Sequence, residues 1–84
     1  MKLVFSEEAW DDYLFWQKQD KAVLRRINEL ILACKRDPFV GIGKPEPLKH
    51  ALAGFWSRRI TEEHRMVYKP EKDALLIAQL RYHY

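Results

Sequence analysis

The clearest hydrophobic pattern in the chain lies between Asp20 and Asp37. Apolar side chains recur there every three or four residues, the spacing of one helix face, at Val23, Leu24, Ile27, Leu30, Ile31 and Cys34. Asp20 is a suitable N-cap, and Pro38 obliges the helix to end by about Asp37, because the residue before a proline disfavours helical conformation. Cys34 continues the apolar stripe, which indicates a buried structural thiol rather than a nucleophile.

An earlier helix is predicted near residues 7–17. Ser6 is a good N-cap, and the two glutamates that follow it suit the positive end of the helix dipole. We interpret one face of this helix as core packing, formed by Trp10, Tyr13, Leu14 and Gln17. Only two or three residues separate this helix from the next, so a helical hairpin is expected.

Strand patterns occupy the start and the second half of the chain. Residues 2–5 form a short first strand, and three more are expected at 55–60, 65–69 and 74–82, with breaks at 61–64 and 70–73. Residues 38–54 hold three of the four prolines and all three glycines, a composition typical of a long ordered loop. The order β-α-α-β-β-β predicts one α+β domain over residues 1–84, an antiparallel-rich twisted sheet with the helical hairpin on one face.

Alternation along the last strand sorts its side chains between two faces. Leu76, Ala78 and Leu80 are expected on the side covered by the helices. Gln79, Arg81 and His83 then lie on the open side, and the terminal Tyr84 is free to stack on a base.

The charge is unevenly distributed. The net charge is +3; residues 1–43 carry seven Lys/Arg against seven Asp/Glu, and residues 44–84 carry eight against five. A polyanion is therefore expected to meet the C-terminal half. One cysteine, no signal-peptide pattern and no apolar run near the ~20 residues of a membrane span indicate a cytoplasmic protein without a membrane segment.

Several residues of the C-terminal half suit phosphate chemistry. Glu46 stands between two prolines, which stiffen the loop that presents its carboxylate. Arg58, Arg59 and Arg65 are candidate phosphate ligands, because a guanidinium matches phosphate oxygens and stays charged. Arg59 and Arg65 share a face if the hairpin between them has an odd number of loop residues; a two-residue turn would separate them.

RNA cleavage needs few protein groups, since the substrate's own 2'-OH is the nucleophile. Glu46 is a candidate base, His83 a candidate acid, and Arg59, Arg65 and Lys49 a cationic shell. No clustered carboxylates suggest a two-metal nuclease and no zinc-ligand spacing is present, so we expect neither metal nor cofactor. The residues alone leave open a solvated Glu46, arginines on a solvated strand face and a frayed, idle His83.

The whole chain resembles the YoeB family, toxins of the RelE superfamily with a small microbial-RNase-like domain. The resemblance lies in the segments 10–13 (WDDY), 27–31 (INELI), 43–50 (GKPEPLKH), 54–65 (GFWSRRITEEHR) and 81–84 (RYHY). It implies cleavage of messenger RNA in the ribosomal A site, with Glu46, Arg65 and His83 as base, cation and acid. Supporting roles fall on Lys49, Arg59, Glu63 and Tyr84. It also implies a cognate antitoxin whose disordered tail orders on the toxin, and a possible homodimer.

Two other functions remain to be weighed. A protein of the same fold that blocks a topoisomerase would not require Glu46 together with a C-terminal histidine. A non-catalytic RNA-binding regulator would use the same arginines and tyrosine. Replacement of His83 separates these from the nuclease, because only a nuclease should lose its activity.

Overall fold

Two capped helices form one layer of the structure. α1 spans Glu7–Gln19 and α2 spans Lys21–Arg36. Ser6 Oγ caps α1 by accepting the N–H of its third residue, and the Asp20 carboxylate caps α2 by accepting two N–H groups of its first turn. Asp20 also donates its own N–H to the carbonyl of Trp16, so one residue ends α1 and begins α2. The predicted helical hairpin is confirmed.

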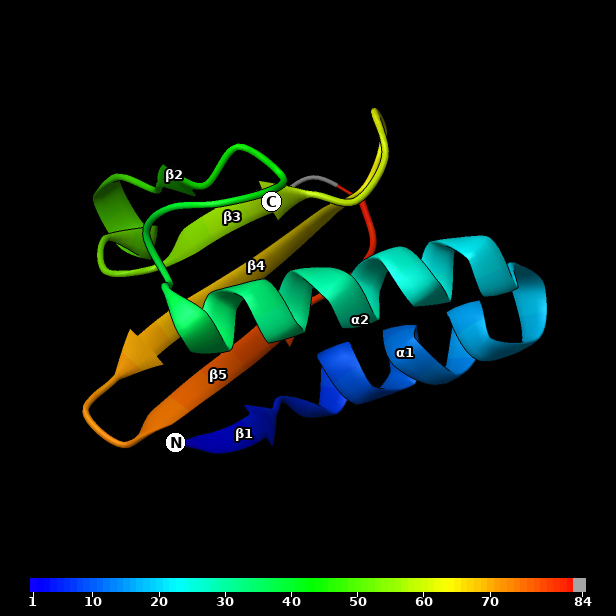
Figure 1. Ribbon diagram of the computed structural model, residues 1–84, viewed down its shortest axis with the longest axis horizontal. Coiled ribbons are helices and arrows are strands. Elements are labelled where there is room, and N and C mark those ends of the chain that lie inside the picture. The colour runs from blue at the N-terminus through cyan, green and yellow to red at the C-terminus, as the bar shows by residue number, and fades with distance from the viewer. Residues whose placement is uncertain (83–84) are drawn as a thin grey trace.

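A five-stranded sheet forms the other layer. The computed structural model describes residues 1–82, and in it both helices lie on one face of the sheet (Figure 1). The strands are β1 (Lys2–Phe5), β2 (Glu46–Pro47), β3 (Trp56–Arg59), β4 (Arg65–Glu71) and β5 (Ala74–Gln79), in the spatial order β1-β5-β4-β3-β2. Only β1 pairs in parallel, with β5; the other pairs are antiparallel. The α+β, antiparallel-rich architecture is confirmed, with β2 and a short 3-10 helix, η1 (His50–Leu52), inside the predicted loop.

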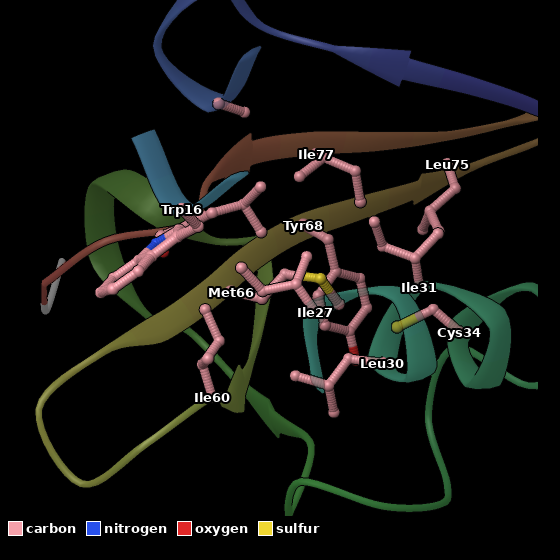
Figure 2. Close-up of a cluster of buried hydrophobic side chains, with 12 residues drawn as sticks. Trp16, Ile27, Leu30, Ile31, Cys34, Ile60, Met66, Tyr68, Leu75 and Ile77 are labelled. Carbon is pink, nitrogen blue, oxygen red and sulfur yellow. The ribbon is translucent and has the colours of Figure 1, made fainter. Parts of the chain in front are cut away.

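The hydrophobic core lies between the two layers. The predicted stripe of α2 faces it: Ile27, Leu30, Ile31 and Cys34 are buried. Figure 2 shows Tyr68 reaching from β4 into the middle of this cluster. Burial raises the pKa of the Cys34 thiol above its ordinary value, although the charge of Arg58 opposes the shift. The prediction of a buried structural thiol is therefore confirmed.

The predicted core face of α1 is wrong in part. Trp10 and Leu14 are 48% and 40% exposed, whereas Ala9, Asp12 and Trp16 are buried. The inward stripe of α1 therefore contains a carboxylate, which a search for apolar periodicity passes over. Trp10 instead stacks on Tyr13 at the rim of the helix, with 5.8 Å between ring centroids.

The predicted faces of the last strand are also wrong in part. Leu75 and Ile77 point into the core, and Leu76 and Ala78 do not. Tyr68 pairs with Ile77 while its neighbour Val67 pairs with Gln79, so one extra residue is inserted in β5. This β-bulge at Ala78 shifts the alternation by one, which is why Leu80 faces the helices as predicted and Leu76 does not.

Two strand ends differ from prediction. β4 continues through Pro70 to Glu71, because beyond Tyr68 it has a partner strand on one side only and a missing N–H is tolerated. β5 ends at Gln79 rather than at residue 82. The chain leaves the strand at Leu80, whose N–H and carbonyl bond to α1 instead of to a strand.

A buried arginine holds the loop between α2 and β2. Arg58 is 0% exposed. Its guanidinium donates to the carbonyls of Asp37, Val40 and Ile42 at 2.7, 3.1 and 3.0 Å, and its Nε donates to Tyr68 Oη at 3.1 Å. Asp37 is the C-cap of α2, so the cation also meets the negative end of that helix dipole.

The loop can pass this close to Arg58 only with glycine at its tightest point. Gly43 has φ +84°, and a Cβ there would lie 2.8 Å from Leu30 Cδ2 and 3.0 Å from Arg58 Cβ. Tyr68 Oη adds a bond to the carbonyl of Pro38 at 2.6 Å. The loop that leads to Glu46 is thus tied from within the core.

No helix among residues 1–82 is long and apolar enough to span a membrane.

Arg58→Met should lower the free energy of unfolding by about 3 kcal/mol or more, because it removes the donor of the buried Tyr68 hydroxyl and of three loop carbonyls. The matched control is Arg59→Met, on an exposed neighbour of the same strand, where we expect a change within about 0.5 kcal/mol. Urea unfolding of the two variants makes the comparison. Equal stabilities would show that the Arg58 bonds do not hold the loop.

Stability should fall in alkaline solution through Tyr68. Burial raises its pKa from 10.0 to about 12, although the hydrogen bond from Arg58 opposes the shift. As the pH rises, the unfolded chain therefore loses this proton before the folded chain does. The contribution of protonated Tyr68 to the free energy of unfolding is complete below pH 10. It is lost as the pH rises towards 12, by about 2 to 3 kcal/mol in all. Urea unfolding between pH 9 and 11.5 should show a steeper decline for wild type than for Tyr68→Phe. Parallel declines would contradict this.

Candidate active site

The face of the sheet opposite the helices carries polar residues from β2, β3, β4 and β5. Residues directly opposite each other on antiparallel strands share a face. Glu46 pairs with Ser57, Ser57 with Val67, and Val67 with Gln79, so these four form one row across the sheet. Ser57 and Val67 are buried, although Val67 lies outside the core cluster. Ser57 and Val67 therefore form a buried floor in the middle of the row, with the exposed Glu46 at its β2 end.

A pair of arginines forms the adjoining row. Arg59 pairs directly with Arg65, which confirms that the two share a face. Arg65 Nη1 donates to Ser57 Oγ at 3.3 Å, which leans its guanidinium towards the row that begins with Glu46. Neither arginine makes an ion pair within residues 1–82. Like charges directly opposite each other on paired strands are unfavourable, and an anion between them removes that penalty.

The loop residues of the site lie beside Glu46. Lys49, exposed, follows β2 by two residues and is the N-cap of η1. A shallow depression runs from Glu46 through Lys49 to Leu52. The carboxylate and the ammonium therefore line one hollow at the β2 edge of the sheet. The backbone of Glu46, flanked by two prolines, continues the loop that Arg58 holds through hydrogen bonds.

The remaining predicted site residues lie elsewhere. Glu63 is in the β3–β4 hairpin, 71% exposed, with its carboxylate 3.6 Å from His64 Nε2. It borders a second hollow with Trp16 and Tyr82, not the depression of Glu46 and Lys49. His83 and Tyr84 lie outside the described residues. Within residues 1–82 no three His, Cys, Asp or Glu side chains gather closely enough to hold a metal ion.

Two predicted placements of arginine are wrong. Arg58 is not available as a phosphate ligand, because its donors are used inside the protein. Arg81 does not share the open face with Gln79; its guanidinium lies over the ring of Phe15 in α1, 3.6 Å from the centroid. The strand ends before Arg81, so the alternation on which that placement rested does not extend to it.

Sequence reasoning missed the residues that hold the chain end. Leu80 N–H donates to the buried carboxylate of Asp12 at 2.9 Å, and Trp16 Nε1 donates to the Leu80 carbonyl at 2.9 Å. Tyr82 N–H donates to His64 Nδ1 at 2.8 Å. One signal was visible in the sequence: Asp12 and Trp16 stand four residues apart, on one face of α1.

Comparison with known proteins identifies the family of the chain. A family model described as "YoeB-like toxin of bacterial type II toxin-antitoxin system" matches residues 5–84. Toxin YoeB of Escherichia coli K12 is 67% identical over the full length of both chains. The solved YoeB/ParE toxin from Agrobacterium tumefaciens is 53% identical and superposes with a TM-score of 0.97, covering 100% of each chain.

YoeB of Staphylococcus aureus has been solved in two assemblies. One is a dimer, 44% identical to this chain with a TM-score of 0.94; the other is a YoeB-YefM complex, 42% identical with a TM-score of 0.92. Each match covers 100% of this chain and 98% of the other. By sequence over its whole length and by fold, the chain belongs to the YoeB-like toxins of bacterial type II toxin–antitoxin systems.

Proposed function

We propose that the protein is a ribosome-dependent endoribonuclease toxin that cleaves messenger RNA in the ribosomal A site without a metal ion. Membership of the YoeB-like toxins supports the toxin role. The observation that carries the enzymatic proposal is the register of the sheet. It brings Glu46, Arg59 and Arg65 to one face in adjoining rows, with Arg65 leaning towards the row of Glu46.

The proposed reaction is an in-line transfer at phosphorus. The Glu46 carboxylate takes the proton of the 2'-OH, whose oxygen attacks the adjacent phosphorus. The bond to the 5'-oxygen breaks, and His83 gives that oxygen a proton. The products are a 2',3'-cyclic phosphate and a 5'-hydroxyl. Arg65 stabilises the negative charge that develops on the phosphoryl oxygens, beside a buried floor that limits screening by water.

The position of the chain end is consistent with this division of roles. The Tyr82 carbonyl accepts a hydrogen bond from the N–H of Arg65 at 3.1 Å. His83 is the next residue, so the chain reaches the proposed acid from a point fixed beside the proposed cation. Lys49 and Arg59 would hold flanking phosphates, Glu63 would support the hairpin side, and Tyr84 would stack on a base.

The partners follow from the same surface. Messenger RNA on the ribosome is the proposed substrate, and an antitoxin with an acidic, disordered tail is the proposed inhibitor. Lys49, Arg59 and Arg65 make no ion pair within residues 1–82 and offer it complementary charge. S. aureus YoeB, solved both as a dimer and with YefM, supports an antitoxin complex and a homodimer for this chain. We place the protein in the cytoplasm, where ribosomes are.

Two other functions compete. A non-nuclease toxin of the same fold, acting on a topoisomerase, would have no use for a carboxylate and arginines in adjoining rows of one sheet face. A non-catalytic RNA-binding regulator would bind through Arg59 and Arg65 without needing Glu46. Both alternative functions would affect growth or translation without cutting RNA. Direct mapping of cuts therefore distinguishes them from the nuclease.

The first test is in vitro translation with mapping of messenger 5'-ends by primer extension in the presence of wild type or His83→Gln. Because His83 supplies the leaving-group proton, we expect cuts inside A-site codons with wild type only. Ribosome binding, measured by co-sedimentation, should be the same for both. Unimpaired translation without cuts by either protein would favour the topoisomerase reading, and equal cutting by both would remove His83 from the mechanism.

Single-turnover cleavage on programmed ribosomes should separate the roles of Glu46 and Arg65. Arg65→Ala should lower the rate by on the order of 10² to 10³, comparable to the loss of one oxyanion donor. Glu46→Gln should lower it by about 10² or more through loss of the base. The control is Arg25→Ala, on the exposed side of α2, which should keep the wild-type rate. A loss in ribosome affinity alone for Arg65→Ala would make it a binding residue.

A further inference from the structure

The chain end is held through backbone groups, beginning at Leu80. Both polar backbone groups of this residue are taken by side chains of α1: the N–H by Asp12 and the carbonyl by Trp16. All three residues are buried. Hydrogen bonds to an ionised carboxylate in such surroundings are strong and directional. Leu80 is thereby fixed against α1 after the chain has left the sheet.

Tyr82 is held in the same way, but in an unfavourable conformation. Its φ is +60°, the left-handed region that costs a non-glycine residue about 1 to 3 kcal/mol. Its carbonyl accepts from Arg65 N–H, and its N–H donates to His64 Nδ1 at 2.8 Å. Such a conformation persists only where its surroundings impose it, and these two bonds come from consecutive residues of one hairpin.

His64 is itself fixed, on the helix side of the sheet. Its side chain is 13% exposed, and its ring lies edge to face with Trp16, 4.8 Å between centroids, and 5.4 Å from the ring of Tyr82. Because Nδ1 accepts a hydrogen bond, Nε2 is the ring nitrogen that is available to donate one. That nitrogen points to the exposed Glu63 carboxylate, 3.6 Å away.

We infer that His64 is a positioning residue: through Nδ1 it imposes the backbone turn at Tyr82 and so sets the point from which His83 acts. The inference rests on the proposed function. His64 lies on the side of α1, whereas its neighbour Arg65 lies on the open side. The contribution of His64 is the backbone conformation of Tyr82, the residue that precedes His83. Displacement of a reacting group by about 1 Å lowers a rate by up to about 10²-fold.

Two substitutions separate the acceptor from the ring. His64→Phe keeps the aromatic contacts with Trp16 and Tyr82 but removes the acceptor. His64→Asn removes the ring but can present its amide oxygen near the place of Nδ1. In cleavage on programmed ribosomes, His64→Phe should lower kcat at least about tenfold with KM and unfolding midpoint near wild type, and His64→Asn should recover most of that loss. Wild-type kcat for His64→Phe, or equal losses in both variants, would overturn the inference.

A second measurement does not depend on the reaction. By NMR, the Tyr82 amide should be protected from hydrogen exchange in wild type and in His64→Asn, and should exchange at least about tenfold faster in His64→Phe. Unchanged protection in His64→Phe would overturn the inference. If wild type cleaves no RNA, the proposed function fails, and the Tyr82 amide still decides whether His64 fixes the chain end.

Discussion

The structure depends on a cation without a counterion. Arg58 is completely buried, and among residues 1–82 no carboxylate pairs with it; its charge is balanced by carbonyl oxygens at the end of α2 and along the following loop. Burying a charged group costs free energy unless each of its donors has an acceptor. The loop is therefore held at the carbonyls that accept hydrogen bonds from the guanidinium. The same loop delivers Glu46 to the sheet, and its Gly43 carbonyl accepts the N–H of Arg59. The need to solvate one arginine thereby determines where the carboxylate of the candidate site stands.

Because side chains alternate between the two faces of a strand, neighbouring residues of this protein make different contacts. Arg58 faces the core and ties the loop, and Arg59 faces solvent. His64 faces α1, and Arg65 faces the open side next to Ser57. In both pairs the residue that faces the core or α1 is held by contacts there, and it thereby positions the backbone of its neighbour on the open side. A sheet provides this arrangement directly, because consecutive side chains point to opposite faces.

How much the sequence predicts depends on whether the information is local. The stripe of α2 and its cap at Asp20 follow from spacing, and both are found. The shared face of Arg59 and Arg65 was one of two alternatives, and the register of the hairpin decides for it. The inward face of α1 was mistaken, because Asp12 is buried only by virtue of a bond to Leu80, 68 positions away. The bulge at Ala78 could not be recognised from the local sequence either. Because of it, Leu75 faces the core and Leu76 does not, the reverse of the prediction. Arg58 and Arg59 are the same residue type in adjacent positions, so composition could not distinguish the structural one from the exposed one.

The proposed base and the proposed acid therefore depend on two separate groups of positioning residues. The carboxylate side depends on Arg58 and Tyr68, and the side of the chain end depends on Asp12, Trp16 and His64. Each group contains one residue of the same hydrophobic core: Tyr68 from β4 and Trp16 from α1 (Figure 2). A substitution in that core can thus alter the distance between base and acid without touching either. For a chain of 84 residues this is an economical arrangement, since the residues that stabilise the fold are also the ones that set the geometry of the open face.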